Sequence, residues 1–261
     1  MIQFSKETDE YREGGAQECW CLHGSVGLAS DWRSVAKAFA ADKIGTRAVD
    51  LWRFLECNPL SLPDFAKALN ADAGGRVFRG TGRSLVGYSM GGRMALHALL
   101  EPDHPWTSAV IISTHPGLEN GTERASRRTV DTEWATQALT SDWREFMTRW
   151  NDQPVLGNKA IRDPNLTGAL VMRRREIARS FVDWSLGAQE PLWDRLPEIH
   201  TPLLWIVGEQ DEKFRALAER AVSLIPNARL AIAPDAGHRV PWEAEPWFTQ
   251  KVSRFLKCGE I

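Results

Sequence analysis

The sequence lacks the features that mark several large classes of protein. No stretch approaches the eighteen or more apolar residues that a membrane span requires, and Met1–Gly15 has no apolar leader region. The net charge of −2 gives no reason to expect nucleic acid or an anionic membrane as a partner. The four cysteines lack metal-ligand spacing, and free thiols suit a reducing compartment. We therefore expect a cytoplasmic protein without a metal, nucleic-acid or membrane partner.

Tyrosine is also scarce, with 2 residues against 12 tryptophans. The large apolar rings of the tryptophans must be buried in the protein or must contact a ligand. Hydrophobic residues make up 43% of the 261 residues, enough for the core of one large α/β domain. Cys19 and Cys21 fall in one expected strand, and we expect their side chains on opposite faces of it.

Short apolar runs alternate with amphipathic stretches, the pattern of β–α units around a mostly parallel sheet flanked by helices. Several runs are nearly continuous in apolar residues, as strands covered on both faces should be. The expected strands are Glu18–Leu22, Thr46–Leu51, Ser84–Tyr88, Ala109–Ser113, Leu203–Val207 and Arg229–Ala233. The expected helices are Asp31–Ala41, Leu62–Asn70, Met90–Leu100, Lys213–Ile225 and Ala244–Leu256.

Residues 116–190 break this rhythm, because they contain helical patterns but no convincing strand. We interpret them as a helical cap inserted into a core domain formed by residues 1–115 and 191–261. Arginine suits sites that bind planar carboxylates, although most surface arginines are simply solvated. The cap segment has one lysine, Lys159, against ten arginines: 124, 127, 128, 144, 149, 162, 173, 174, 175 and 179.

Gly87-Tyr88-Ser89-Met90-Gly91 matches G-x-S-x-G, with an expected strand before it and an expected helix after it. In this context the motif predicts a sharp strand-to-helix turn that exposes the serine oxygen. Small residues on either side let the backbones pass closely, and the N-terminus of the new helix favours negative charge. Ser89 is therefore the candidate nucleophile.

The remaining members of a triad should follow in the chain order serine, acid, histidine. Asp211 comes in a loop just after one expected strand, and His238 in a loop after the next. Both loops lie at the sheet edge where open α/β folds place their sites. Glu209 is a close alternative for the acid, and Asp235 a weaker one.

An oxyanion hole would use the backbone N–H of Met90, which follows the nucleophile. The second donor should come from the loop after the early strand Glu18–Leu22, where Ser25 N–H is the candidate. His23, in the same loop, is interpreted as a structural support.

With these residues in place the chain resembles the α/β-hydrolase superfamily over nearly its whole length. Within it, the chain is most similar to the 2-succinyl-6-hydroxy-2,4-cyclohexadiene-1-carboxylate synthase family of menaquinone biosynthesis. The resemblance rests on Gly87–Arg93, on His115-Pro116-Gly117-Leu118 followed by Glu123-Arg124 and Arg127, on Trp150 with Gln153-Pro154-Val155, and on Gly187-Ala188-Gln189 with Leu192-Trp193.

The resemblance implies a lyase that eliminates pyruvate from a cyclohexene dicarboxylate and needs no cofactor. His238, oriented by Asp211, would activate Ser89 as the base that removes a ring proton. The substrate, a small-molecule carboxylate, would be bound by Arg93, Arg124, Arg174 (or a neighbour in the run 173–175), Trp150 and Tyr88.

Two stretches differ from the family pattern. Asp50–Phe54 replaces a Pro-Gly-His-Gly turn, and Met172–Glu176 differs from the family's arginine-bearing cap stretch. The same triad would equally serve a hydrolase of esters or carbon–carbon bonds. A non-catalytic binding protein would require the loss of a triad member, and all three are present.

Overall fold

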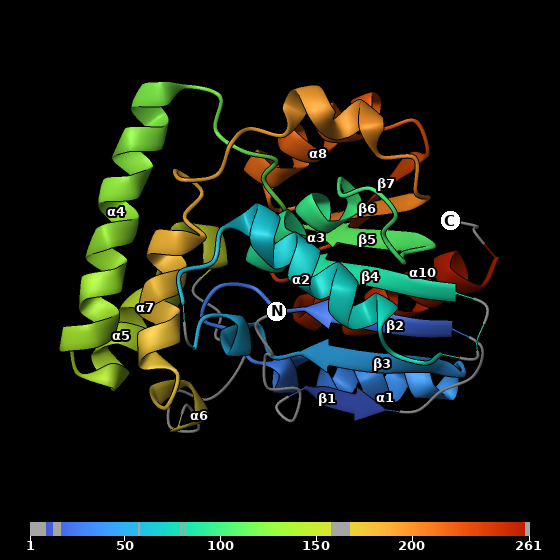
Figure 1. Cartoon of the computed structure of the whole chain (residues 1–261), viewed down its shortest axis with the longest axis horizontal. Coiled ribbons are helices and arrows are strands. Elements are labelled where there is room, and N and C mark those ends of the chain that lie inside the picture. The colour runs from blue at the N-terminus through green and yellow to red at the C-terminus, as the bar shows by residue number, and fades with distance from the viewer. Residues whose placement is uncertain are drawn as a thin grey trace.

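A twisted sheet forms the centre of the computed structural model, which describes residues 9–12, 17–56, 58–78, 80, 82–157 and 168–258 (Figure 1). Its seven strands run in the order β1-β3-β2-β4-β5-β6-β7, and all neighbours are parallel except β1 and β3. The mostly parallel sheet expected from the sequence is thus confirmed. The strands are β1 (Glu10–Arg12), β2 (Gln17–Leu22), β3 (Ile44–Val49), β4 (Gly82–Tyr88), β5 (Ser108–Ile112), β6 (Leu203–Gly208) and β7 (Ala228–Ala233).

Helices cover both faces of the sheet (Figure 1), which explains why several of its strands are nearly continuous in apolar residues. One hydrophobic core lies under α2 (Leu62–Gly74), α3 (Met90–Leu99) and α8 (Glu212–Leu224). A second core lies under α1 (Arg33–Ala41) and α10 (Glu245–Cys258) on the opposite face (Figure 1). The short helices of this part are η1 (Ala29–Trp32), η2 (Leu51–Phe54), η5 (Trp193–Glu198) and α9 (Val240–Glu243).

Strand β2 divides its side chains between these two cores. Trp20 and Leu22 pack into the first core, whereas Cys19 and Cys21 pack into the second. The two cysteine sulfurs lie 3.8 Å apart, both as free thiols. Residues two apart on a strand share a face, so the expectation that these thiols point to opposite faces is wrong.

The segment between β5 and β6 contains no strand within its described residues. Its helices, called the cap helices below, stand beside the sheet (Figure 1). Asn120 and Asp142 accept backbone N–H groups at the starts of the first two, as good N-cap residues do. The cap helices are α4 (Gly121–Thr140), α5 (Trp143–Asn151), α6 (Gly168–Val171) and α7 (Arg174–Asp183), with η3 (Pro154–Leu156) between α5 and α6.

Aromatic rings, tryptophans among them, form the interior of the cap. The ring of Trp134 lies edge-on to Trp150 at 5.2 Å and to Phe146 at 5.9 Å, and Trp150 also contacts Phe181 at 5.4 Å. Such edge-to-face pairs add to the free energy gained by burying the rings. No helix in the described part of the chain is both long enough and apolar enough to cross a membrane.

The cap and the sheet domain meet along a seam where side-chain donors bind main-chain carbonyls. Arg93 donates to the carbonyl of Trp184 at 2.7 Å, and the indole of Trp184 donates to the carbonyl of Leu60 at 2.8 Å. Similar bonds run from Arg179 to Leu55, from Gln189 to Pro116 and from Trp193 to Gly117.

The stretch Asp50–Phe54 turns sharply instead of extending β3. The Asp50 carboxylate accepts the N–H of Trp52 and starts η2, so the expected strand Thr46–Leu51 ends earlier, at Val49. Arg53 is 1% exposed and pairs with Asp9 at 3.0 Å and with Asp72 at 2.8 Å. Burial raises the pKa of Asp9, and the positive charge of Arg53 opposes that shift. The stretch therefore contributes the cation of a buried ion cluster.

We expect Arg53→Met to lower the free energy of unfolding by roughly 3–5 kcal/mol, because two buried carboxylates would lose their main cation. Urea denaturation followed by tryptophan fluorescence measures this change. The matched control is Arg215→Met, which removes an exposed pair with Glu219 and should cost less than about 1 kcal/mol. Similar losses in the two variants would contradict a special role for the buried cluster.

Candidate active site

Ser89 occupies the turn between β4 and α3 with a backbone conformation that L-residues rarely adopt. Its φ is 53° and its ψ is −110°. The turn closes because Gly91 has no side chain: a Cβ at that position would lie 2.4 Å from the carbonyl oxygen of Leu22. The sharp elbow expected from G-x-S-x-G is thus present in the structure.

Three side chains from separate loops form a hydrogen-bonded series at the carboxyl edge of the sheet. The Oγ of Ser89 lies 3.2 Å from Nε2 of His238, whose Nδ1 lies 2.7 Å from a carboxylate oxygen of Asp211. Asp211 follows β6, and His238 follows β7. The ring of Phe214 packs edge-on against His238 at 4.4 Å and so limits its rotation. The arrangement has the geometry in which a histidine can accept the serine proton.

The loop after β2 carries Ser25, and hydrogen bonds from His23 and Trp52 stabilise it. His23 is fully buried; its Nδ1 lies 2.9 Å from the carbonyl of Gly24, and its Nε2 accepts Leu51 N–H. The indole of Trp52 donates to the carbonyl of Gly27 at 2.8 Å and packs on the His23 ring. His23 thus has the supporting position expected of it.

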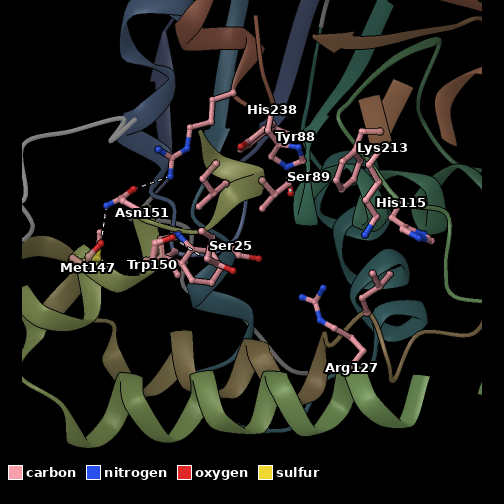
Figure 2. Close-up of a pocket in the computed structure, with 17 residues that line it drawn as sticks. Ser25, Tyr88, Ser89, His115, Arg127, Met147, Trp150, Asn151, Lys213 and His238 are labelled. Carbon is pink, nitrogen blue, oxygen red and sulfur yellow. Dashed lines mark hydrogen bonds between the residues drawn. The ribbon is translucent and has the colours of Figure 1, made fainter. Parts of the chain in front are cut away.

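Ser89 opens into a cavity of about 200 Å³ between the sheet edge and the cap helices (Figure 2). The sheet domain contributes Ser25, Val26, Tyr88, Ser89, His115, Lys213, Phe214, His238 and Arg239. The cap side contributes Arg127, Met147, Trp150, Asn151, Gln153, Val155, Leu156 and Leu186.

The charged side chains that line this cavity all carry positive charge. They are Arg127, Lys213 and Arg239, and neither aspartate nor glutamate belongs to the described lining. Arg239 is 4% exposed and donates to the side-chain oxygen of Asn151 at 2.8 Å. A cavity with such a lining favours an anionic ligand.

Tyr88 and Trp150 both line the cavity. The family resemblance implies that these two side chains flank the ring of the substrate. Tyr88 is buried against His238 and Trp242, and burial raises the pKa of its hydroxyl. Trp150 is half-buried and is held from the cap side by Trp134 and Phe181.

The structure places the three arginines named from the sequence away from this lining. Arg93 donates to Gln189 and to the carbonyl of Trp184, and burial with the nearby charge of Arg127 lowers its pKa to about 10. Arg124 is directed to Glu190, with one nitrogen 2.6 Å from its carboxylate.

Arg174 donates to the carbonyls of Ala138 and Ser141 at the C-terminal end of α4, and its guanidinium stacks on the ring of Trp143. Its neighbour Arg173 pairs with Asp50 at 2.7 Å and with Glu56 at 2.8 Å. Both arginines thus have structural partners.

Sequence reasoning did not single out Lys213, Arg239 or His115 as site residues, and it preferred Arg124 to Arg127. A usable signal existed for two of them: Lys213 comes two residues after Asp211, and Arg239 directly follows His238. Among the residues that the structure describes, no group of three or more His, Cys, Asp or Glu side chains gathers as a metal site would require.

Comparison with known proteins agrees with this geometry. The sequence profile of the alpha/beta hydrolase family matches residues 21–248. The chain therefore belongs to the alpha/beta hydrolase family.

Within that family the chain is similar to proteins of one named activity. It is 34% identical over 177 residues to a putative 2-succinyl-6-hydroxy-2,4-cyclohexadiene-1-carboxylate synthase of Bacillus subtilis (strain 168), covering 66% of this chain and 65% of that protein. It is 28% identical over 252 residues to the Salmonella agona (strain SL483) synthase of the same name, covering 93% and 95%. The solved structure of MenH from S. aureus has the same fold, with a TM-score of 0.82, 24% identity and coverage of 96% and 98%.

We expect a fluorophosphonate probe to label the protein at Ser89, and Ser89→Ala to abolish the labelling. Asp211→Asn should slow labelling by about 10³–10⁴-fold, because an amide no longer fixes the histidine tautomer. Intact-mass spectrometry over time measures both effects. Glu209→Gln is the matched control for the rival acid and should label at the parent rate. If Glu209→Gln were slowed and Asp211→Asn were not, Glu209 would be the acid.

Proposed function

We propose that this protein is a carbon–oxygen lyase of menaquinone biosynthesis, a 2-succinyl-6-hydroxy-2,4-cyclohexadiene-1-carboxylate synthase acting in the cytoplasm. The observation that carries the proposal is a Ser–His–Asp series that opens into a cavity whose charged side chains are all cations. Similarity to proteins named for this activity over 93% of the chain supports the same reading.

In the proposed reaction the triad works as a base. His238 takes the proton of Ser89 Oγ, and the serine oxygen removes a proton from the cyclohexene ring beside a carboxylate-activated carbon. As the new ring double bond forms, the C–O bond to the pyruvate-derived substituent breaks. Pyruvate leaves as its enolate, a negatively charged leaving group. The proton held by His238 compensates that negative charge and is then available to protonate the enolate. Asp211 keeps the His238 ring in the tautomer that can accept the proton.

Negative charge develops on the substrate during proton removal and needs nearby donors. The N–H of Met90 lies in the first turn of α3, where unpaired N–H groups and the helix dipole favour an anion. Ser25 belongs to the loop on the other side of Ser89 and lines the cavity. We assign the backbone N–H groups of these two residues to the oxyanion hole.

Substrate carboxylates need cations within the cavity. We assign to Arg127 the role that the family resemblance implied for Arg124, because Arg127 lines the cavity and Arg124 is paired with Glu190. Tyr88 and Trp150 provide flat walls for the ring. The chemistry requires only proton transfers and charge stabilisation, so the proposal includes no cofactor.

A serine hydrolase of esters or carbon–carbon bonds is the second candidate. It rests on the triad geometry alone, because the same Ser89–His238 contact would serve an acylating nucleophile. The cationic lining favours a multiply charged substrate over a neutral apolar ester.

We expect incubation with the pyruvate-bearing cyclohexene intermediate to release pyruvate and produce the ultraviolet absorbance of the diene. A coupled lactate dehydrogenase assay and direct absorbance measure the two products. Ser89→Ala should lower turnover by at least about 10³-fold because it removes the base. Fast cleavage of p-nitrophenyl esters without pyruvate release would instead support the hydrolase.

We expect Arg127→Met to raise KM for the dicarboxylate by about 10–100-fold, the loss of one or two charge-assisted hydrogen bonds. Steady-state kinetics measure the change, and thermal unfolding checks that the variant remains folded. Arg124→Met is the matched control on the same helix and should leave KM within about threefold. The opposite ranking would restore Arg124 as the carboxylate ligand.

A further inference from the structure

One wall of the cavity gathers donors from three separate segments. Arg127 comes from α4, His115 from the stretch after β5, and Lys213 from the first turn of α8. Figure 2 shows these three side chains on the side of the cavity away from Trp150 and Asn151, with Ser89 between the two sides. The charges of Lys213 and Arg127 both lower the pKa of the His115 ring.

His115 is a neutral hydrogen-bond donor on this wall. The N–H of Gly117 donates to His115 Nδ1 at 3.0 Å, so Nδ1 carries no proton. Burial, with the charges of Lys213, Arg93 and Arg127, lowers the pKa of His115 to about 4. At neutral pH the ring is therefore uncharged, and its proton lies on Nε2.

Arg127 is oriented by a buried carboxylate. Its Nε donates to Asp131 at 2.8 Å, and Ser185 donates to the other oxygen of Asp131 at 2.7 Å. Asp131 is 1% exposed, so it fixes the direction of the guanidinium and offsets much of its charge. The terminal nitrogens of Arg127 remain to face the cavity.

Lys213 supplies a positive charge that no described carboxylate offsets, whereas Asp131 offsets the charge of Arg127. Within the described part of the chain, its ammonium forms no hydrogen bond or ion pair, although it lies two residues from Asp211 and lines the cavity. The Lys213 side chain is exposed, so its ammonium can turn to meet a carboxylate that enters the cavity.

We propose that Lys213 is a specificity-determining residue that, with the Nε2–H of His115 and the guanidinium of Arg127, binds one carboxylate of the substrate. The proposal rests on the proposed function, which requires a substrate with more than one carboxylate. All three groups are donors, and together they carry about one uncompensated positive charge, which matches one carboxylate. Arg239, bonded to Asn151 on the other side of Ser89, leaves a second cation for a carboxylate at the opposite end of the ligand.

The first test compares Lys213→Met, Lys213→Arg and the control Lys67→Met, which alters an exposed lysine on α2 far in sequence from the site. In the pyruvate-release assay, Lys213→Met should raise KM for the dicarboxylate by about 10–100-fold with kcat within about threefold, as expected for lost ground-state binding. Lys213→Arg should return KM to within about threefold of the parent, because the positive charge is kept. A fall in kcat with unchanged KM would overturn the proposal.

The second test does not depend on elimination. Succinate should protect Ser89 of the parent protein from a fluorophosphonate probe, and the protecting concentration should rise about tenfold in Lys213→Met but not in Lys67→Met. Equal protection of parent and Lys213→Met, or no protection of the parent, would overturn the carboxylate subsite. Absence of pyruvate release with Lys213-dependent protection would reject the proposed lyase and retain the subsite.

Discussion

The close approach of three backbones at the nucleophile elbow is the constraint on which the site depends. Besides the contact at Gly91, a Cβ on Gly87 would lie 2.4 Å from the carbonyl oxygen of Gly91. The missing side chains let the first turn of α3 press against the ends of β2 and β4. The positive φ of Ser89 is strained, and it persists because the surrounding packing leaves no alternative. The same approach brings the loop of Ser25 within reach of the serine oxygen.

Much of the fold could be predicted from the sequence because its physical signals are local. The inner strands β2, β3, β4, β5 and β6 are almost wholly buried between the two helical layers, and several of them are therefore recognisable as apolar runs between turns. The elbow glycines and the order of Ser89, Asp211 and His238 along the chain predict the hydrogen-bonded series that the structure contains. Strand β1 cannot be predicted in this way, because it has only three residues, Glu10–Arg12, at the edge of the sheet.

The partners of the arginines could not be predicted, because they are chosen by tertiary packing. Arg124 and Arg127 lie three residues apart on one helix, yet the first reaches Glu190 and the second lines the cavity. Composition showed that the cap is rich in arginine, but it carried no information on which guanidinium is already occupied. Arg93 has the helical spacing to face the nucleophile, and its planar group is instead bound to Gln189 and Trp184. Lys213 and Arg239 contribute much of the positive charge of the cavity lining. Their positions close to Asp211 and His238 in the sequence are the features from which a place in the site could have been predicted.

The seam between cap and sheet domain has a consequence for sequence divergence. Its acceptors include the main-chain oxygens of Leu55, Leu60, Pro116 and Gly117, a group that every amino acid possesses. Substitution at Leu55 or Leu60 leaves the acceptor in place, whereas substitution of a donor such as Trp184 removes a bond outright. Along the seam, the residues that supply carbonyl acceptors therefore tolerate substitution better than the residues that supply side-chain donors. Over evolutionary time the positions that supply only a carbonyl are able to drift in sequence while the docking of the cap on the sheet edge, and with it the wall of the cavity, is preserved.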